Sequence, residues 1–133
     1  MIIARLIIEI AGYPKDHIES VMKGLMEKVK KEYDVDSYDI FEAKKVKNVD
    51  KIFSTFTEME IKFKGIRDLV AFCYDKMPSS VEIIEPIDHL DVKVDSLQDM
   101  FNDLMSKLHE YDSELKELKA RNILLERNVA RNT

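Results

Sequence analysis

The side chains most able to do chemistry in this sequence are three histidines and one cysteine. His17, His89 and His109 lie far apart along the chain, and none of them forms a close pair at metal-ligand spacing. Cys73 falls among apolar residues with no histidine placed to activate its thiol, so we expect a small buried hydrophobe rather than a nucleophile. The sequence has no glycine-rich phosphate loop, nucleophile elbow or HExxH motif. We therefore predict no catalytic residue, no metal site and no cofactor.

A group of loop residues offers the best site for a small molecule. Residues 12–14, 47–50 and 78–80 are expected to meet at one end of a sheet, where amides at the first helix start suit an anion. The candidate ligand residues are Gly12, Tyr13, Pro14, His17, Ser79 and Ser80. Their setting is similar to that of ACT regulatory domains, and the resemblance implies amino-acid binding near the first strand-helix loop at a dimer interface. Ordinary loop formation explains the same residues without a ligand.

RNA is a further alternative for a binding function. Lys44, Lys45, Lys47 and Lys51 form a small basic hairpin, and sheets of the expected fold can stack bases on exposed aromatic side chains. The strand over residues 52–63 lacks the basic-glycine-aromatic opening of RNA-recognition motifs. A net charge of -5 and a pI of about 5.3 also oppose a partner made of phosphates. RNA therefore ranks third among the hypotheses.

Composition places the chain among folded cytoplasmic proteins. Hydrophobic residues make up 45% and charged residues 35%, which is typical of a folded domain with a highly charged surface. A single cysteine cannot form an internal disulfide. Residues 1–10 are interrupted by Arg5 and Glu9, unlike a signal peptide or a membrane span. We expect a cytoplasmic protein with no membrane partner.

The elements that position these residues follow the order strand, helix, strand, strand, helix, strand. Alternation predicts strands over residues 2–10, 38–46, 52–63 and 80–85, and apolar spacings of three and four predict two intervening helices. For the second helix the predicted inner stripe is Ile66, Leu69, Val70, Cys73 and Met77. This order is the split βαβ pattern of the ferredoxin-like fold. The alternation of Leu90, Val92 and Val94 suggests an extra edge strand, which completes an α+β domain over residues 1–95.

A heptad repeat runs through the last third of the chain and predicts a long C-terminal coiled-coil helix over residues 96–133. Apolar residues recur in alternating steps of four and three without a skip. The a positions are Phe101, Leu108, Leu115, Asn122 and Val129, and the d positions are Leu97, Leu104, Tyr111, Leu118 and Leu125. We call these ten residues the seam and expect them to form a dimer interface. A surface helix folded back on its own domain is the alternative.

The charges beside the seam favour two identical helices in parallel. In a parallel pair each g residue meets the e residue five places later on the other helix. The matching pairs of opposite sign are Lys107 with Asp112, Glu114 with Lys119, and Arg121 with Glu126. Exposed ion pairs contribute only a few tenths of a kcal/mol each, so they select the partner and its direction more than they stabilise the dimer.

Asn122 at an a position also favours two parallel strands, because a lone buried Asn is best satisfied by its own copy. Residues 122–129, with Asn122 at an a position, Leu125 at the next d position and Val129 at the next a position, resemble the leucine zipper of bZIP transcription factors. The residues before the seam are acidic and provide no basic region. The resemblance therefore implies pairing and not DNA binding.

These patterns together predict a non-catalytic homodimer that serves as a scaffold or adaptor. Its partners would be a second copy of itself and another protein. The alternative is a small-molecule-binding regulatory domain of the ACT type at the loop end of the sheet.

Overall fold

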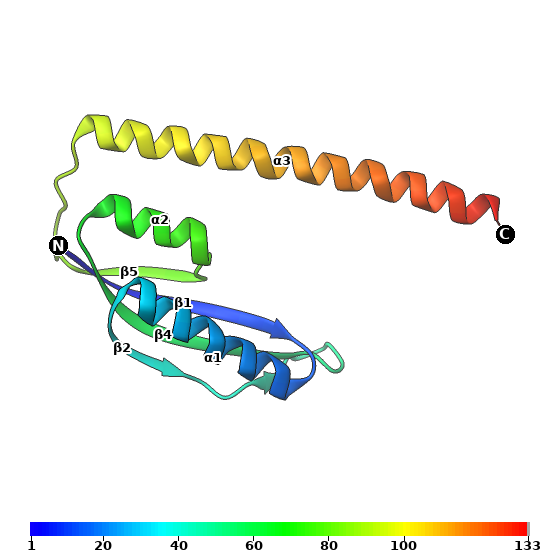
Figure 1. The fold of residues 1–133 in the computed structure, drawn as a ribbon, viewed down its shortest axis with the longest axis horizontal. Helices are drawn as coiled ribbons and strands as arrows, with labels where there is room; N and C mark the ends of the chain where they lie inside the picture. Colours follow the sequence, from blue (N-terminus) through cyan, green and yellow to red (C-terminus); the bar gives the residue numbers. More distant parts are fainter. Residues whose placement is uncertain (133) are drawn as a thin grey trace. The chain divides into compact units, whose positions relative to one another are not determined.

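The computed structural model describes residues 1–132, which divide into two compact units. The first unit, residues 1–91, carries all the strands, and we call it the head. The second unit starts at residue 92 and consists mainly of one helix, α3 (Val94–Arg131), of 38 residues (Figure 1).

The head is built on a five-stranded antiparallel sheet. Its central strand β1 (Ile2–Gly12) pairs on one side with β4 (Phe53–Phe63) and on the other with β5 (Ser80–Glu85). Strands β2 (Asp34–Ile40) and β3 (Lys44–Lys45) both pair with β4. Helix α1 (Lys15–Glu32) follows β1 and α2 (Ile66–Lys76) follows β4 (Figure 1). This arrangement confirms the predicted ferredoxin-like α+β fold.

The core of the head lies between one face of the sheet and the two helices. Alternate residues of β1 and β4 point to this face, as period-two alternation predicts. The sheet contributes Ile2, Ala4, Leu6, Ile8, Met59, Ile61 and Phe63, and the helices contribute Met22, Met26, Val29, Leu69 and Phe72. The alternation from which the first and third strands are predicted therefore places their apolar residues on the core face.

The predicted inner stripe of α2 is wrong at two residues, one that it omits and one that it includes. Phe72, which the stripe omits, is fully buried and packs edge-to-face against Tyr33 and Phe63, with centroid distances of 4.9 and 5.7 Å. Met77, which the stripe includes, is 70% exposed. The helix ends at Lys76, and Met77 adopts a left-handed conformation with φ of 49°, which turns it out of the helical stripe.

The second strand differs from its prediction because it lies at a sheet edge. β2 begins at Asp34, four residues before the predicted start, and leaves the ladder after Ile40. Its outward-facing residues are polar, and a register shift between Val35 and Ser37 breaks the alternation. Only the two-residue β3 resumes pairing with β4.

The extra edge strand predicted from Leu90, Val92 and Val94 is wrong. Residues 89–93 form no strand, and Val94 is the first residue of α3. The additional short strand of the sheet is β3, which precedes the long strand β4. Three alternating apolar residues are too short a pattern to separate a strand from the approach to a helix.

Candidate functional site

The seam is a largely apolar stripe along α3, and all ten of its residues are exposed. None of the residues of α3 is buried. The exposed fraction is 57% at Phe101, 54% at Leu118 and 64% at Val129. A sustained stripe of exposed large apolar side chains is typical of interaction surfaces. The helix start at Val94 adds one residue that the sequence prediction missed, because Val94 lies seven residues before Phe101 and occupies a further a position.

Several charges beside the seam form ion pairs within the single helix. Lys107 Nζ lies 3.8 Å from Glu110, and Arg121 Nη2 lies 2.6 Å from Glu117. Asp112 Oδ2 is 2.9 Å from Lys116 Nζ. These partners are outer positions of the helix, and such exposed pairs contribute a few tenths of a kcal/mol. Within residues 1–132, the other three flanking charges, Glu114, Lys119 and Glu126, make no ion pair.

Near its C-terminal end the seam borders an open depression of about 510 Å³. It is lined by Asn122, Leu125, Glu126, Val129 and Ala130. Residues of an a position, a d position and an e position thus surround one space, which is how a coiled coil forms the hole for a side chain of the facing helix. Val129 and Leu125 are each at least 60% exposed there.

The predicted ligand loops do not all meet. The hairpin after β3 and residues 12–14 share one end of the sheet, because Gly12 pairs with Phe53. Ser80 instead pairs with Ile7, five residues before Gly12 along β1. At about 3.3 Å per residue, this separates Ser80 from Gly12 by roughly 16 Å. Tyr13 is exposed, and the backbone amide of His17 donates to the carbonyl of Pro14 as part of the first helical turn.

Two of these residues have structural roles in the head. A Cβ atom on Gly12 would lie 3.0 Å from Ile18 Cγ2, so glycine allows α1 to pack closely against the end of β1. The amide and hydroxyl of Ser79 both donate to the carbonyl oxygen of Ile7, at 2.7 and 3.2 Å. The hydrogen bonds of Ser79 fix the start of β5 against β1. The packing at Gly12 and the hydrogen bonds at Ser79 explain both residues without a ligand.

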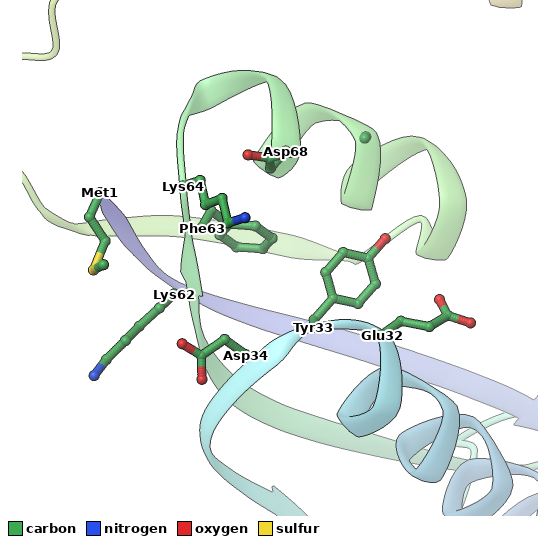
Figure 2. Close-up of a pocket in the computed structure, with 9 residues that line it drawn as sticks. Met1, Glu32, Tyr33, Asp34, Lys62, Phe63, Lys64 and Asp68 are labelled. Atoms are coloured by element: carbon green, nitrogen blue, oxygen red, sulfur yellow. The ribbon is translucent and has the colours of Figure 1, made fainter.

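A pocket of about 450 Å³ lies at the opposite end of the head, where β4 ends and α2 begins (Figure 2). The registers Ile2 with Phe63 and Gly12 with Phe53 place this pocket roughly 33 Å from the loop end. Its lining combines aromatic rings with charges of both signs: Met1, Glu32, Tyr33, Asp34, Lys62, Phe63, Lys64, Asp68 and Ala71. Burial, followed by the charge of Asp75, raises the pKa of Tyr33, which keeps its hydroxyl protonated at neutral pH. The residues come from four elements, so no sequence motif identifies the pocket.

The histidines and the cysteine are not gathered into a metal-binding group in the part of the chain that the structure describes. Over residues 1–132, no group of His, Cys, Asp and Glu side chains is arranged to hold a metal ion. Cys73 is partly buried, and this burial raises the pKa of its thiol. None of the helices in the same range is both long and apolar enough to span a bilayer.

Comparison with known proteins identifies a family through a match to residues 3–131. The chain belongs to the MJ0538 family. No curated protein and no solved structure matches the chain. The family match runs through the head and almost all of α3.

Proposed function

We propose that this protein is a non-catalytic homodimeric adaptor or scaffold. Two copies join through a parallel coiled coil of their α3 helices, and their heads present surfaces to another protein. The observation that carries the proposal is the uncovered seam of α3, flanked by charges that complement a second copy of the same helix.

The lack of burial along α3 supports a partner for this helix. A helix of 38 residues is about 57 Å long, and most helical stability in proteins comes from packing of an apolar face. In the single chain that face contacts solvent. Burying one leucine side chain stabilises by about 1.5–3 kcal/mol, and a seam repeated on two helices multiplies this contribution. A second α3 supplies a matching seam without any other protein.

The direction and number of helices follow from the charged and polar positions. A parallel dimer brings Glu114 of one copy to Lys119 of the other, and an antiparallel pair does not. Asn122 faces its own copy only in a parallel dimer that is in register.

The test is sedimentation equilibrium of the full chain and of charge variants at micromolar concentration. We expect the natural chain to be a dimer. Glu114→Lys or Lys119→Glu alone places like charges together twice per dimer and should weaken association several-fold. The double variant restores opposite charges and should recover the natural dissociation constant. Arg127→Glu, at an outer f position, is the control and should leave association unchanged.

A monomer at micromolar concentration would end the proposal. If the two single variants and the double variant all form dimers with the same dissociation constant, the helices are not in this parallel register. Crosslinking through a cysteine introduced at Val129 then distinguishes parallel helices, which crosslink there, from antiparallel helices, which do not.

The pocket beside Tyr33 favours a second candidate function, a sensor of a small zwitterionic molecule. Its aromatic walls and its mixture of carboxylates and lysines suit a ligand that carries both charges. Thermal-shift measurements with amino acids test this function, because a ligand that binds only the folded head raises its melting temperature. The variant Tyr33→Phe keeps the ring and removes the hydroxyl, so it tests whether the hydroxyl contributes to ligand binding. No shift with any amino acid would remove this candidate.

A further inference from the structure

The face of the sheet opposite α1 and α2 is not covered by any helix of the head. Both helices pack on the face that holds the core, and β1 residues of the other parity, such as Arg5 and Ile7, point away from it. We call this side the outer sheet face. Directly opposite residues in an antiparallel sheet share a face, so the strand registers define which side chains meet on it.

Negative charge dominates the outer sheet face. Its carboxylates are Glu9, Asp34, Asp39, Glu58, Glu60, Glu82 and Glu85, which lie on all four of the longer strands. The cations on the same face are Arg5, Lys62 and, opposite Ser54, Lys44. Lys62 Nζ is 3.9 Å from Asp36 Oδ1, so its charge is already partly compensated within β2 and β4. The face therefore has an excess of carboxylates that the head itself does not neutralise.

Arg5 lies at the centre of this face and is shared by three glutamates. Its guanidinium nitrogens lie 3.2 Å from Glu58, 2.9 Å from Glu60 and 3.4 Å from Glu82. Asp39 stands directly opposite Glu58 on the neighbouring strand. Like charges at directly opposite positions destabilise a sheet, and within residues 1–132 no ion pair engages Asp39. The head thus retains an unfavourable arrangement that an external cation would relieve.

Apolar side chains lie among these charges. Ile3 and Ile7 flank Arg5 along β1 and are half-buried. At one end of the face the rings of Phe41 and Phe56 stack with a centroid distance of 4.4 Å and an interplanar angle of 20°. Both phenylalanines are about 40% exposed. Exposed aromatic ring faces attract Lys and Arg side chains, so the apolar and acidic parts of the face favour the same kind of partner.

We infer that the outer sheet face is the docking site for an amphipathic, Lys- and Arg-rich segment of a partner protein. This inference rests on the adaptor function proposed above and names the chemistry of what the adaptor holds. The excess of carboxylates repels nucleic acid, anionic lipid and the same face of a second copy, because all of these carry negative charge. A segment with cations interleaved with apolar residues pairs with the carboxylates and covers Ile3, Ile7 and the two rings.

The test measures binding of a fluorescein-labelled peptide of alternating Lys and Leu to the full-length protein by anisotropy. Asp39→Lys removes the repulsion with Glu58 inside the head while it opposes a cationic ligand. We expect this variant to melt at or above the natural temperature and to bind the peptide about tenfold more weakly. Loss of binding together with a retained fold separates docking from folding. Glu9→Lys, on β1 of the same face, should act in the same direction.

Glu27→Lys is the matched control, because it makes the same charge change on the exposed side of α1. It should change the dissociation constant by less than twofold. Equal weakening by Asp39→Lys and Glu27→Lys would show that the peptide responds only to net charge and would overturn the inference. Absence of peptide binding at physiological salt would do the same.

A second copy's basic hairpin, with Lys44, Lys45, Lys47 and Lys51, is a competing occupant. If Lys47→Ala with Lys51→Ala makes the peptide bind more tightly than Lys28→Ala with Lys31→Ala on the exposed side of α1, that hairpin occupies the face and the inference is wrong. Sedimentation of the same samples separates this inference from the adaptor proposal. A dimer without peptide binding overturns the docking site alone, whereas a monomer that binds the peptide overturns the coiled coil alone.

Discussion

The head and α3 differ in whether their apolar side chains are buried within the single chain. The head encloses Leu6, Met22 and Phe72 almost completely with residues of its own. Helix α3 carries at least as regular an apolar pattern, yet buries no residue. The head therefore gains the free energy of apolar burial within one chain, whereas in the proposed dimer α3 gains it from a second copy.

This difference teaches that the two units should respond separately to mutation. The head depends on contacts between residues distant in sequence, and its stability should be independent of protein concentration. If α3 pairs as we propose, its stability should rise with concentration. The predictions below test this separation, from the largest expected effect to the smallest.

Leu118→Asp should abolish the dimer. The substitution places two charges in the middle of the seam, and burying unpaired charges costs several kcal/mol each. We expect a monomer by sedimentation and a loss of helical circular dichroism, with the melting temperature of the head unchanged. Ser113→Asp adds the same charge at an outer f position and should remain a dimer. Unfolding of the head in the Leu118→Asp variant would contradict the separation of the units.

Phe72→Ala should give the reverse result. It removes a fully buried ring that contacts Tyr33 and Phe63, and such truncations cost about 3–5 kcal/mol. Urea unfolding of the head, followed by tyrosine fluorescence, should show this loss. Dimerisation at low denaturant should be retained. Met77→Ala, directly after the C-terminal end of this helix, is the control, because Met77 is exposed and its loss should change stability by less than about 0.5 kcal/mol.

Thr57→Val should stabilise the head. The hydroxyl of Thr57 is fully buried and has no hydrogen-bond partner in the structure. Valine has nearly the same shape and removes the unsatisfied group, so we expect a gain of about 1 kcal/mol by thermal or urea unfolding. Thr55→Val is the matched comparison, because the Thr55 hydroxyl donates to the carbonyl of Phe41. That variant should destabilise. A loss of stability in Thr57→Val would show that the hydroxyl is satisfied in solution.

Cys73 should react slowly with alkylating agents. Burial raises the pKa of its thiol, so a smaller fraction is thiolate at pH 8 than in a peptide. Iodoacetamide labelling, followed by mass spectrometry, should be slower than for the unfolded chain and should accelerate as pH rises. Because the folded thiol keeps its proton to higher pH, its contribution to stability is present below the unfolded pKa and is lost as pH rises through the folded pKa. Equal labelling rates in the folded and unfolded chain would contradict this prediction.

Much of the fold follows from local pattern. The strands β1 and β4 alternate over long stretches with one apolar face, and both are where the pattern predicts them. Prediction fails where the pattern is short or polar, as in β2 and at Leu90. It also fails at Phe72 and Met77, because the inner stripe of a short helix depends on how that helix rotates against the sheet and where it ends. Neither property is encoded in spacing alone.

The candidate sites divide in the same way. The seam lies on one helix, so the heptad spacing predicts which of its residues share a face. The pocket beside Tyr33 and the shared ion pairs of Arg5 join residues from several elements, and no spacing along the chain indicates them. The sequence predicts that Ser79 and Ser80 join the loop end, but the short β5 places them beside Ile7.

The sequence by itself determined the ferredoxin-like order of elements and the apolar stripe of α3, because both arise from side-chain periodicity along a single element. Only the tertiary structure decided that Arg5 is shared by three glutamates, that Asp39 faces Glu58, and that Phe72 completes the core. These features depend on strand register and helix rotation, which are set by packing between segments far apart in the chain.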